Sequence, residues 1–395
     1  MANVLASILP KILARGLLAL REQAVMPRLV NADFSTEAAQ KGDTIDVPLP
    51  TAIKAIDVVP SNIPPVPADT TPDKVAIKLD QWKQSTPFHL TDKELTEVDR
   101  NAHFVPMQVS EAIRGLTNEV NLSIHNEFKG VFGFTGTPGV TPFATDVTDA
   151  TNSRKILNQQ RAPRTDRRGV LDFDAEAAAL ALKEFSDAEK IGSVNVKLEG
   201  EIGRKFGIDW VADDQVVTHT AGSVTGDPTV TGANAIGVTS IDFTTDADDT
   251  VDLLEGDIIT FSGPTGHVQT YAVTADVTIP NSSSGAVPIA GPGDGSDSNK
   301  GLKVALVGSE TITVKATHVV NLVFHRDAFA YATRPLAAET SDLSLGNQIM
   351  TMQDPQTGLV LRLEISRQHK QTVWEFDILW GVKLVRPELA TRLAG

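Results

Sequence analysis

The residues of this chain that could do chemistry are few and scattered. Eight histidines occur in 395 residues, with no HExxH motif and no His pair three to five residues apart. A protein zinc site needs three or four His, Cys or carboxylate ligands close together, and the chain has no cysteine. The pattern therefore favours hydrogen-bonded or solvated histidines, and we expect no metal site. The histidines are His89, His103, His125, His219, His267, His318, His325 and His369.

Two segments resemble ligand-binding loops only loosely. Residues 130–139, GVFGFTGTPG, repeat glycine every third residue, but they follow a helical pattern and lack the Gly-Lys-Ser/Thr of a phosphate loop. Residues 246–257, DADDTVDLLEGD, are acid-rich but lack the turn glycine and the ligand spacing of an EF-hand. We predict a helix stop with a flexible turn at the first segment and a solvated acidic turn at the second.

A cluster of arginines lies in residues 161–168, RAPRTDRR: Arg161, Arg164, Arg167 and Arg168. No aromatic residues are interleaved with them, so a nucleic-acid site is weakly supported. The cluster could meet acidic surface on a neighbouring subunit, and a solvated loop is an equal alternative. The chain also lacks a Gly-x-Ser-x-Gly motif and a carboxylate pair placed for acid–base work, so we expect no catalytic residues and no cofactor.

The composition is that of a globular protein, with 41% hydrophobic and 22% charged residues. No apolar run approaches the length of about 20 residues that a membrane helix needs. The net charge of −15 argues against sequence-independent DNA binding, which requires an excess of Lys and Arg. No Lys or Arg lies between Lys205 and Lys300, a stretch that holds fourteen Asp and Glu residues. This uneven charge predicts a separate acidic domain.

Two helices are predicted from apolar periodicity in the first half. Residues 104–132 carry one stripe at helical spacing, formed by Val109, Ile113, Leu116, Val120, Ile124 and Phe128. Residues 173–192 form a second helix, with Asp172 or Asp174 as its cap and Gly192 at its end. Residues 1–33 also read as an amphipathic helix, without the charge order or cleavage site of a signal peptide.

Residues 46–79 combine two alternating apolar runs with seven prolines and form a long arm. Proline has no N–H for a sheet ladder, so this arm does not belong in a sheet interior. It is also too long for an ordinary connection. We predict that it packs on another copy of the same protein. The prolines are Pro48, Pro50, Pro60, Pro64, Pro65, Pro67 and Pro72.

The second half reads as β structure. Short runs separated by Gly, Asn, Ser and Pro turns predict an antiparallel barrel or sandwich in the acidic quarter, with residues 280–301 as a mobile loop. From about residue 316, long alternating strands resume, so the acidic domain is predicted to be an insertion. In the last of these strands Trp374, Phe376, Ile378 and Trp380 share one face, opposite Glu375 and Asp377.

This order of elements and several strings resemble the P22-type coat protein family of tailed phages, whose shells use the HK97-type fold. The strings are LPKILARGLLALREQAVMPRLVN, KGDTIDVPLP, GTPG after the long helix, EGEIGRKFGIDW before the insertion, and WEFDILWGVKLVRPELA near the end. The similarity covers nearly the whole chain. The opening and closing strings are the most specific, and the inserted domain is the least.

The resemblance implies an α+β HK97-type fold with a long spine helix and an inserted all-β barrel. The expected layout is an N-arm helix at 1–33, an E-loop arm with flanking strands at 34–90, a peripheral domain with the spine helix at 91–139, an axial and peripheral core at 140–215, the inserted acidic barrel at 216–316, and axial and peripheral core strands at 317–395. The E-loop residues expected to contact a neighbouring subunit are Ile53, Ile56, Val58, Val59, Ile63, Val66, Val75 and Ile77.

The function implied is that of a major capsid protein, which assembles as hexamers and pentamers into an icosahedral shell enclosing double-stranded DNA. The expected partners are a scaffolding protein and a portal protein, without a membrane, and the expected location is the virion after assembly in the bacterial cytoplasm. The arginine cluster would then form charge contacts between capsomers. A β-rich tail or adhesin component is the main alternative, and an intracellular enzyme with an unrecognised site is a weaker one.

The shell that gives the HK97-type fold its name is crosslinked by Lys–Asn bonds. Lys54 lies in the arm, but no residue near it in the sequence marks it as reactive. We therefore predict that mature particles boiled in SDS release only monomers on a denaturing gel. A ladder of SDS-resistant oligomers would contradict this.

Overall fold

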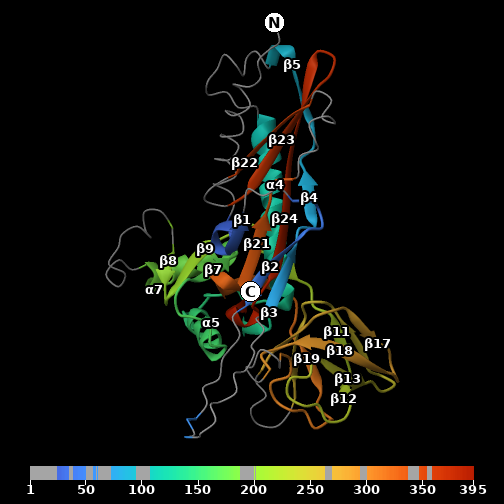
Figure 1. The fold of residues 1–395 in the computed structure, drawn as a ribbon. Coiled ribbons are helices and arrows are strands. Elements are labelled where there is room, and N and C mark those ends of the chain that lie inside the picture. Colours follow the sequence, from blue (N-terminus) through green and yellow to red (C-terminus); the bar gives the residue numbers. More distant parts are fainter. Residues whose placement is uncertain are drawn as a thin grey trace.

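The computed structural model describes residues 25–34, 39–49, 57–58, 60, 73–94, 107–186, 200, 202–262, 269–293, 300–336, 347–353 and 358–395. The fold is α+β, with two sheets of seven strands, a separate β region and one long helix. Figure 1 shows three parts: a long blade around the helix α4, a compact part that holds α5 and β7–β9, and a β region to one side. The C-terminus lies in the middle of the molecule.

The blade is organised around the helix α4 (Met107–Asn126), which continues as the 3-10 turn η2 (Glu127–Gly130). The predicted apolar stripe is confirmed, because all six of its residues are buried in the main core. The α-helix ends at Asn126, earlier than the predicted residue 132, because the chain tightens into η2 there. Twenty residues at about 1.5 Å each make α4 roughly 30 Å long.

The first sheet covers α4 along the blade. Its order is β1-β21-β24-β23-β22, and β4 and β5 also pair with β24. The strands are β1 (Asn31–Phe34), β4 (Gln81–Gln84), β5 (Phe88–Thr91), β21 (Phe329–Thr333), β22 (Gln348–Gln353), β23 (Val360–Arg367) and β24 (Gln371–Leu384).

The predicted two-faced pattern of β24 is confirmed. Trp374, Phe376, Ile378 and Trp380 are all buried in the same core as the α4 stripe. The Trp380 indole donates a hydrogen bond of 2.9 Å to Ser123 Oγ on the helix. The helix predicted for residues 1–33 is wrong at its end, because Asn31–Phe34 form β1 and pair in parallel with β21.

The second sheet has the order β6-β25-β20-β7-β9-β8, with β10 also paired to β20, and Figure 1 shows β7, β8 and β9 beside the lower part of the blade. Its strands are β6 (Gly133–Gly136), β7 (Arg167–Leu171), β8 (Gly203–Lys205), β9 (Ile208–Ala212), β10 (Thr218–His219), β20 (His318–His325) and β25 (Ala390–Ala394). The short turn η3 (Arg326–Ala328) carries the chain from β20 to β21 in the first sheet. The strands after residue 316 therefore contribute to both sheets.

The glycine-rich segment after α4 is a strand where a flexible turn was predicted. Gly133–Gly136 form β6, which pairs in parallel with β25. A Cβ on Gly136 would lie 2.5 Å from the Ala394 carbonyl oxygen, and the residue has φ +86°. The glycine therefore permits a close approach of the two backbones.

The other α-helices in the described residues are short: α2 (Met26–Leu29), α5 (Thr148–Gln159), α6 (Phe173–Ala181) and α7 (Lys183–Ser186). The predicted helix over 173–192 is wrong as one element, because Leu182 adopts an extended conformation between α6 and α7. Asp172 occupies the position before α6, but its side chain makes no capping hydrogen bond. Among the helices in the described ranges, none has both the length and the apolar content of a membrane span.

Strands β11 to β19, together called the inserted β region, leave the second sheet after β10 and rejoin it at β20. The predicted antiparallel β structure is confirmed for this segment. The strands are β11 (Ser223–Thr225), β12 (Thr229–Val230), β13 (Ser240–Thr244), β14 (Thr250–Leu253), β15 (Ile258–Phe261), β16 (Tyr271–Val273), β17 (Val277–Ile279), β18 (Ser284–Ala290) and β19 (Ile312–Val314).

The inserted β region has its own apolar core. Its sheets, β11-β14-β17 and β12-β13-β18-β16-β15-β19, share buried residues such as Phe243, Val251 and Tyr271. A bridge between Thr229 and Thr311 links the two ends of the larger sheet. The loop predicted over 280–301 is wrong in part, because β18 lies within it and buries Val287 and Ile289.

The buried face of α4 gives a direct test of this packing. Ile113→Ala should lower the free energy of unfolding by about 2–5 kcal/mol, because it leaves a cavity under β24. Gly115, two residues away, has open space where a Cβ would lie, with no atom within 4 Å of that position. Gly115→Ala should therefore raise the free energy of unfolding by about 0.5–1 kcal/mol. Urea denaturation of the unassembled chain measures both. Equal effects of the two variants would contradict the burial pattern.

Candidate inter-subunit surface

The root of the predicted arm is the antiparallel hairpin of β2 (Thr44–Leu49) and β3 (Asp73–Lys78). Its residues alternate, as the sequence suggests for a strand with one covered face. On the outer face Lys74 Nζ lies 2.6 Å from Asp46 Oδ2, and this ion pair raises the pKa of the lysine. On the inner face Ile45, Val47, Leu49 and Val75 are half-buried.

The hairpin root packs on its own chain. Ile77 is fully buried, in a cluster with Leu79, Ala330, Ala332, Leu379 and Val385. The expectation that Ile77 contacts a neighbouring subunit is therefore wrong, because its side chain is covered within the same chain. Val75 lies at the edge of this cluster and keeps part of its surface exposed.

The outer part of the arm is represented by only three described residues. Val58 is 93% exposed, the largest exposed fraction among the large apolar side chains that the structure describes. Asp57 and Pro60 are exposed as well. The other predicted contact residues, Ile53, Ile56, Val59, Ile63 and Val66, lie outside the described residues. Val58 is thus an apolar side chain that its own chain leaves in water.

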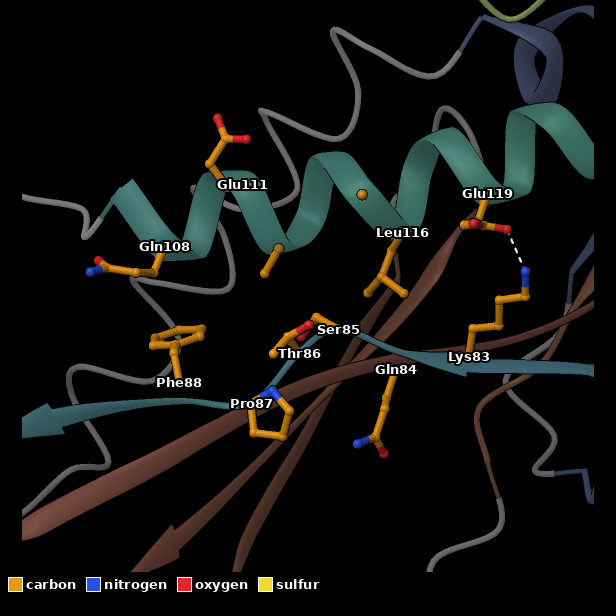
Figure 2. Close-up of a pocket in the computed structure, with 12 residues that line it drawn as sticks. Lys83, Gln84, Ser85, Thr86, Pro87, Phe88, Gln108, Glu111, Leu116 and Glu119 are labelled. Atoms are coloured by element: carbon orange, nitrogen blue, oxygen red, sulfur yellow. Dashed lines mark hydrogen bonds and ion pairs between the residues drawn. The ribbon is translucent and has the colours of Figure 1, made fainter.

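A groove of about 550 Å³ lies between α4 and the segment that links β4 to β5 (Figure 2). Small residues on the helix, Ala112 and Gly115, leave the space open. Leu116 points from the helix toward the strand segment, and Glu111 points away from it. An ion pair of Lys83 and Glu119 crosses from strand to helix at one end. The lining is mixed apolar and polar, with no grouping suited to catalysis.

The arginine cluster divides into two pairs. Arg161 and Arg164 are exposed. Arg167 is buried, and its guanidinium donates to the carbonyls of Pro163 and Ala162 and to Asn158 Oδ1, at 2.7–2.8 Å. The expected intercapsomer contact of Arg167 is therefore wrong, since its donors hold the turn between α5 and β7.

Arg168 is half-buried and donates to the Arg28 carbonyl oxygen at 2.6 Å. Burial lowers the pKa of both Arg167 and Arg168 from the ordinary arginine value. The charges that face outward from this cluster are those of Arg161 and Arg164. Their role in contacts between capsomers remains a prediction.

A buried polar cluster that no sequence motif predicts lies beside the inserted β region. It contains His219, Asp257, His318 and Arg392, all at most 7% exposed. The acidic segment 246–257 was predicted to be solvated, but its last residue, Asp257, is fully buried. Within the described ranges, no three His, Asp or Glu side chains are grouped so as to hold a metal ion.

Comparison with known proteins gives only distant structural similarity. No protein-family model and no curated protein matches the sequence. A chain of Mycobacterium phage Che8 aligns over 94% of this chain and 91% of its own, with 11% identity and a TM-score of 0.45. A chain of the bacteriophage PhiM1 mature capsid aligns over 94% and 87%, with 10% identity and a TM-score of 0.43.

A chain of a virus-like particle from Pyrococcus furiosus aligns over 97% of this chain and 98% of its own, with 7% identity and a TM-score of 0.44. These TM-scores lie below 0.5, so a shared fold does not follow from the alignments. The geometry of this chain and the strings in its sequence must carry any functional conclusion.

The division of the arginine cluster predicts a difference in stability. Arg167→Met keeps most of the side-chain volume but removes three hydrogen bonds, so it should lower the free energy of unfolding by about 2–3 kcal/mol. Arg164→Met, at an exposed position, should change it by less than about 0.5 kcal/mol. Urea denaturation of the unassembled variants checks both values. An equal loss in the two variants would contradict the assignment of Arg167.

Proposed function

We propose that this chain is the major capsid protein of a tailed bacteriophage, with an HK97-type fold, and that its copies close into an icosahedral shell around packaged double-stranded DNA. The role is structural, without catalysis. The copies would associate as hexamers and pentamers, with a scaffolding protein during assembly and a portal protein at one vertex. The finished protein would lie in the virion, after assembly in the host cytoplasm.

The observation that carries this proposal is the arm. A proline-rich segment leaves the hairpin β2–β3, and the described part of it holds a valine that is almost fully exposed. Most large apolar side chains in the described part of the chain are buried, in four clusters, and the next most exposed after Val58 are Val307 at 74% and Phe173 at 58%. A segment with this composition is explained if a neighbouring copy covers it.

The order of elements supports the same conclusion. The hairpin precedes the long helix α4, the inserted β region interrupts the second sheet, and the strands resume afterwards. The P22-type resemblance implies this order, with E-loop, spine helix, insertion and closing strands in turn. The domain layout given by that resemblance is part of the proposal, with the hairpin root as a fixed base for the E-loop.

The arm's chemistry suits reversible assembly. Prolines restrict the free arm to extended conformations, so less conformational entropy is lost when it docks. Burial of roughly 500 Å² of apolar surface would contribute about 12 kcal/mol before the cost of association, which cancels most of it. Each contact is then weak, and the closed shell multiplies many of them.

The proposal is tested by electron microscopy of the overexpressed chain, alone and together with a candidate scaffolding protein from the same genome. We expect closed shells of uniform diameter. Rods or discrete trimers would favour a tail or adhesin component, and a small soluble oligomer at every concentration would favour an enzyme. Either of these outcomes would overturn the proposal.

A single-residue change tests the arm within that experiment. Val58→Asp should lower the yield of shells at least about tenfold, because a charge replaces an apolar contact worth roughly 1.5–3 kcal/mol. Val58→Ile is the matched control and should assemble normally. Both variants should unfold like the parent chain, since Val58 is exposed in the single subunit. Normal assembly of Val58→Asp would contradict a contact at this position.

A further inference from the structure

The inserted β region is joined to the rest of the chain by two strands that pair with each other. The chain leaves through β10 and returns through β20, and these strands are antiparallel partners. Thr218 pairs with Val319, and His219 pairs with His318. The two histidines thus lie opposite one another where the chain crosses in both directions. We call residues 217–222 and 315–320 the neck.

Asp257 is the buried acid of the neck. It lies in the turn between β14 and β15 and is fully buried. Its carboxylate accepts hydrogen bonds from the backbone N–H groups of Leu254 and Gly222, and His219 Nε2 lies 2.8 Å from Oδ1. These contacts tie the exit strand to a turn of the inserted β region.

Arg392 is the buried cation of the neck, and it lies on β25 at the end of the chain. It is fully buried, and its guanidinium donates to the Gly256 carbonyl at 2.6 Å and to the Lys129 carbonyl at 3.0 Å. The guanidinium also lies 4.9 Å from the centre of the Phe128 ring. One side chain therefore joins the last strand, the end of η2 and the inserted β region.

His318 lies near both of these charged groups, and its surroundings favour the neutral form of its ring. Its Nδ1 lies 2.8 Å from the Ala316 carbonyl oxygen, so this nitrogen carries the proton that is donated there. Its Nε2 is buried without a hydrogen-bond partner. A proton added at Nε2 would create a cation with no acceptor, close to Arg392. Burial, with smaller contributions from Arg392 and His219, lowers the pKa of His318 to about 4.

Several other titratable groups lie around the neck, and those nearest to His318 affect its protonation. Asp257 favours a charged His318, and Arg392 and His219 oppose it. At the rim, Lys129 and Glu255 form an ion pair of 2.9 Å. From α4, His125 is also buried, and burial lowers its pKa to about 4. His125 packs near Phe128.

Further contacts between the inserted β region and the two sheets surround Phe132 in the described residues. Phe132 packs with Ile258 and Ala272 in a small apolar cluster. The Thr270 hydroxyl donates to the Phe132 carbonyl at 2.7 Å. The buried polar groups of the neck therefore lie beside an apolar contact in the same junction.

We propose that the neck is an acid-sensitive latch: protonation of His318 beside Arg392 releases the inserted β region from the two sheets while that region stays folded on its own core. The inference goes beyond the proposed function and does not depend on it, because it concerns the single chain. In a shell, such a latch would let acid change the orientation of this region.

The direction of the pH effect follows from the linkage of protonation and opening. A histidine held neutral in the closed neck, with a pKa of about 4 against 6.5 in water, favours closure fully above pH 6.5. That preference is lost as the pH falls toward 4, because the open state takes up the proton first. The two pKa values correspond to roughly a 20-fold increase in the opening constant at pH 5 relative to pH 7, from the histidine equilibrium alone.

Hydrogen exchange on the full-length, unassembled chain at pH 7 and pH 5 tests the proposal, with rates corrected for intrinsic exchange. The reporters are the neck amides of Gly222 and Val320, which donate to Asp257 and to the Val217 carbonyl. We expect their protection to fall roughly 20-fold at pH 5. The β13–β18 amides of the inserted β region should keep their protection.

Two matched variants show whether the loss of neck protection at pH 5 is due to His318. His318→Asn retains a donor for the Ala316 carbonyl but does not titrate, so it should reduce the fall to less than about threefold. His325→Asn, at the far end of the same strand, should leave the fall unchanged. Unchanged neck protection in the parent chain at pH 5 would overturn the latch, even if the His318 variant failed to fold. Loss of neck and β13–β18 protection together, or abolition of the fall by His125→Asn alone, would also overturn it.

Discussion

The burial of one helix face against one strand is the constraint on which the rest of the structure depends. The stripe of α4 and the four alternating large residues of β24 form the centre of the main core. Because β24 is 14 residues long, it can pair with β4, β5, β21 and β23 at successive positions. A shift of β24 by one residue would turn its core-facing side chains to the other face of the sheet. The packing of these side chains on α4 therefore fixes the register of β24 with its four neighbours.

The same constraint explains how the chain places its two unusual parts. The hairpin root packs Ile77 against Leu379 of β24, so the arm starts from a rigid base. The inserted β region attaches near the same end of β24, through different residues, where η2, β20 and β25 meet. Figure 1 shows this region beside the lower end of the blade, with the C-terminus nearby. The hairpin root and the inserted β region are thus held by different sets of contacts.

The sequence was informative where periodicity and burial agree. The α4 stripe and the alternation of Trp374 to Trp380 predict their buried faces because each pattern repeats over several turns or residues. Prediction was poor where tertiary contacts override local signals. Gly133–Gly136 has the composition of a turn but forms β6. At Gly133 and Gly136 the backbone of β25 lies so close that a Cβ would be 2.9 Å and 2.5 Å from its carbonyl oxygens, so glycine permits the pairing. Val287 and Ile289 are only two apolar positions in a polar segment, yet they place β18 within a sheet.

Contacts at the candidate inter-subunit surface were also hard to predict from local sequence patterns. Exposed Val58 was anticipated from the composition of the arm, but Ile77 and Arg167 were assigned to contacts although their partners lie within the chain. Alternation alone cannot say which molecule covers an apolar face. The neck was missed because His219, Asp257, His318 and Arg392 are far apart in sequence and match no motif. Only the pairing of β10 with β20 and the insertion of β25 bring them together.

If the proposed function is right, the arm of each subunit is covered by a neighbouring copy of the chain. The most direct measurement is an electron cryo-microscopy reconstruction of the assembled particle at a resolution that shows side chains. The account predicts that Val58 is buried against a different subunit of a closed shell. An arm folded back on its own subunit, with Val58 covered by that subunit or left in solvent, would contradict it.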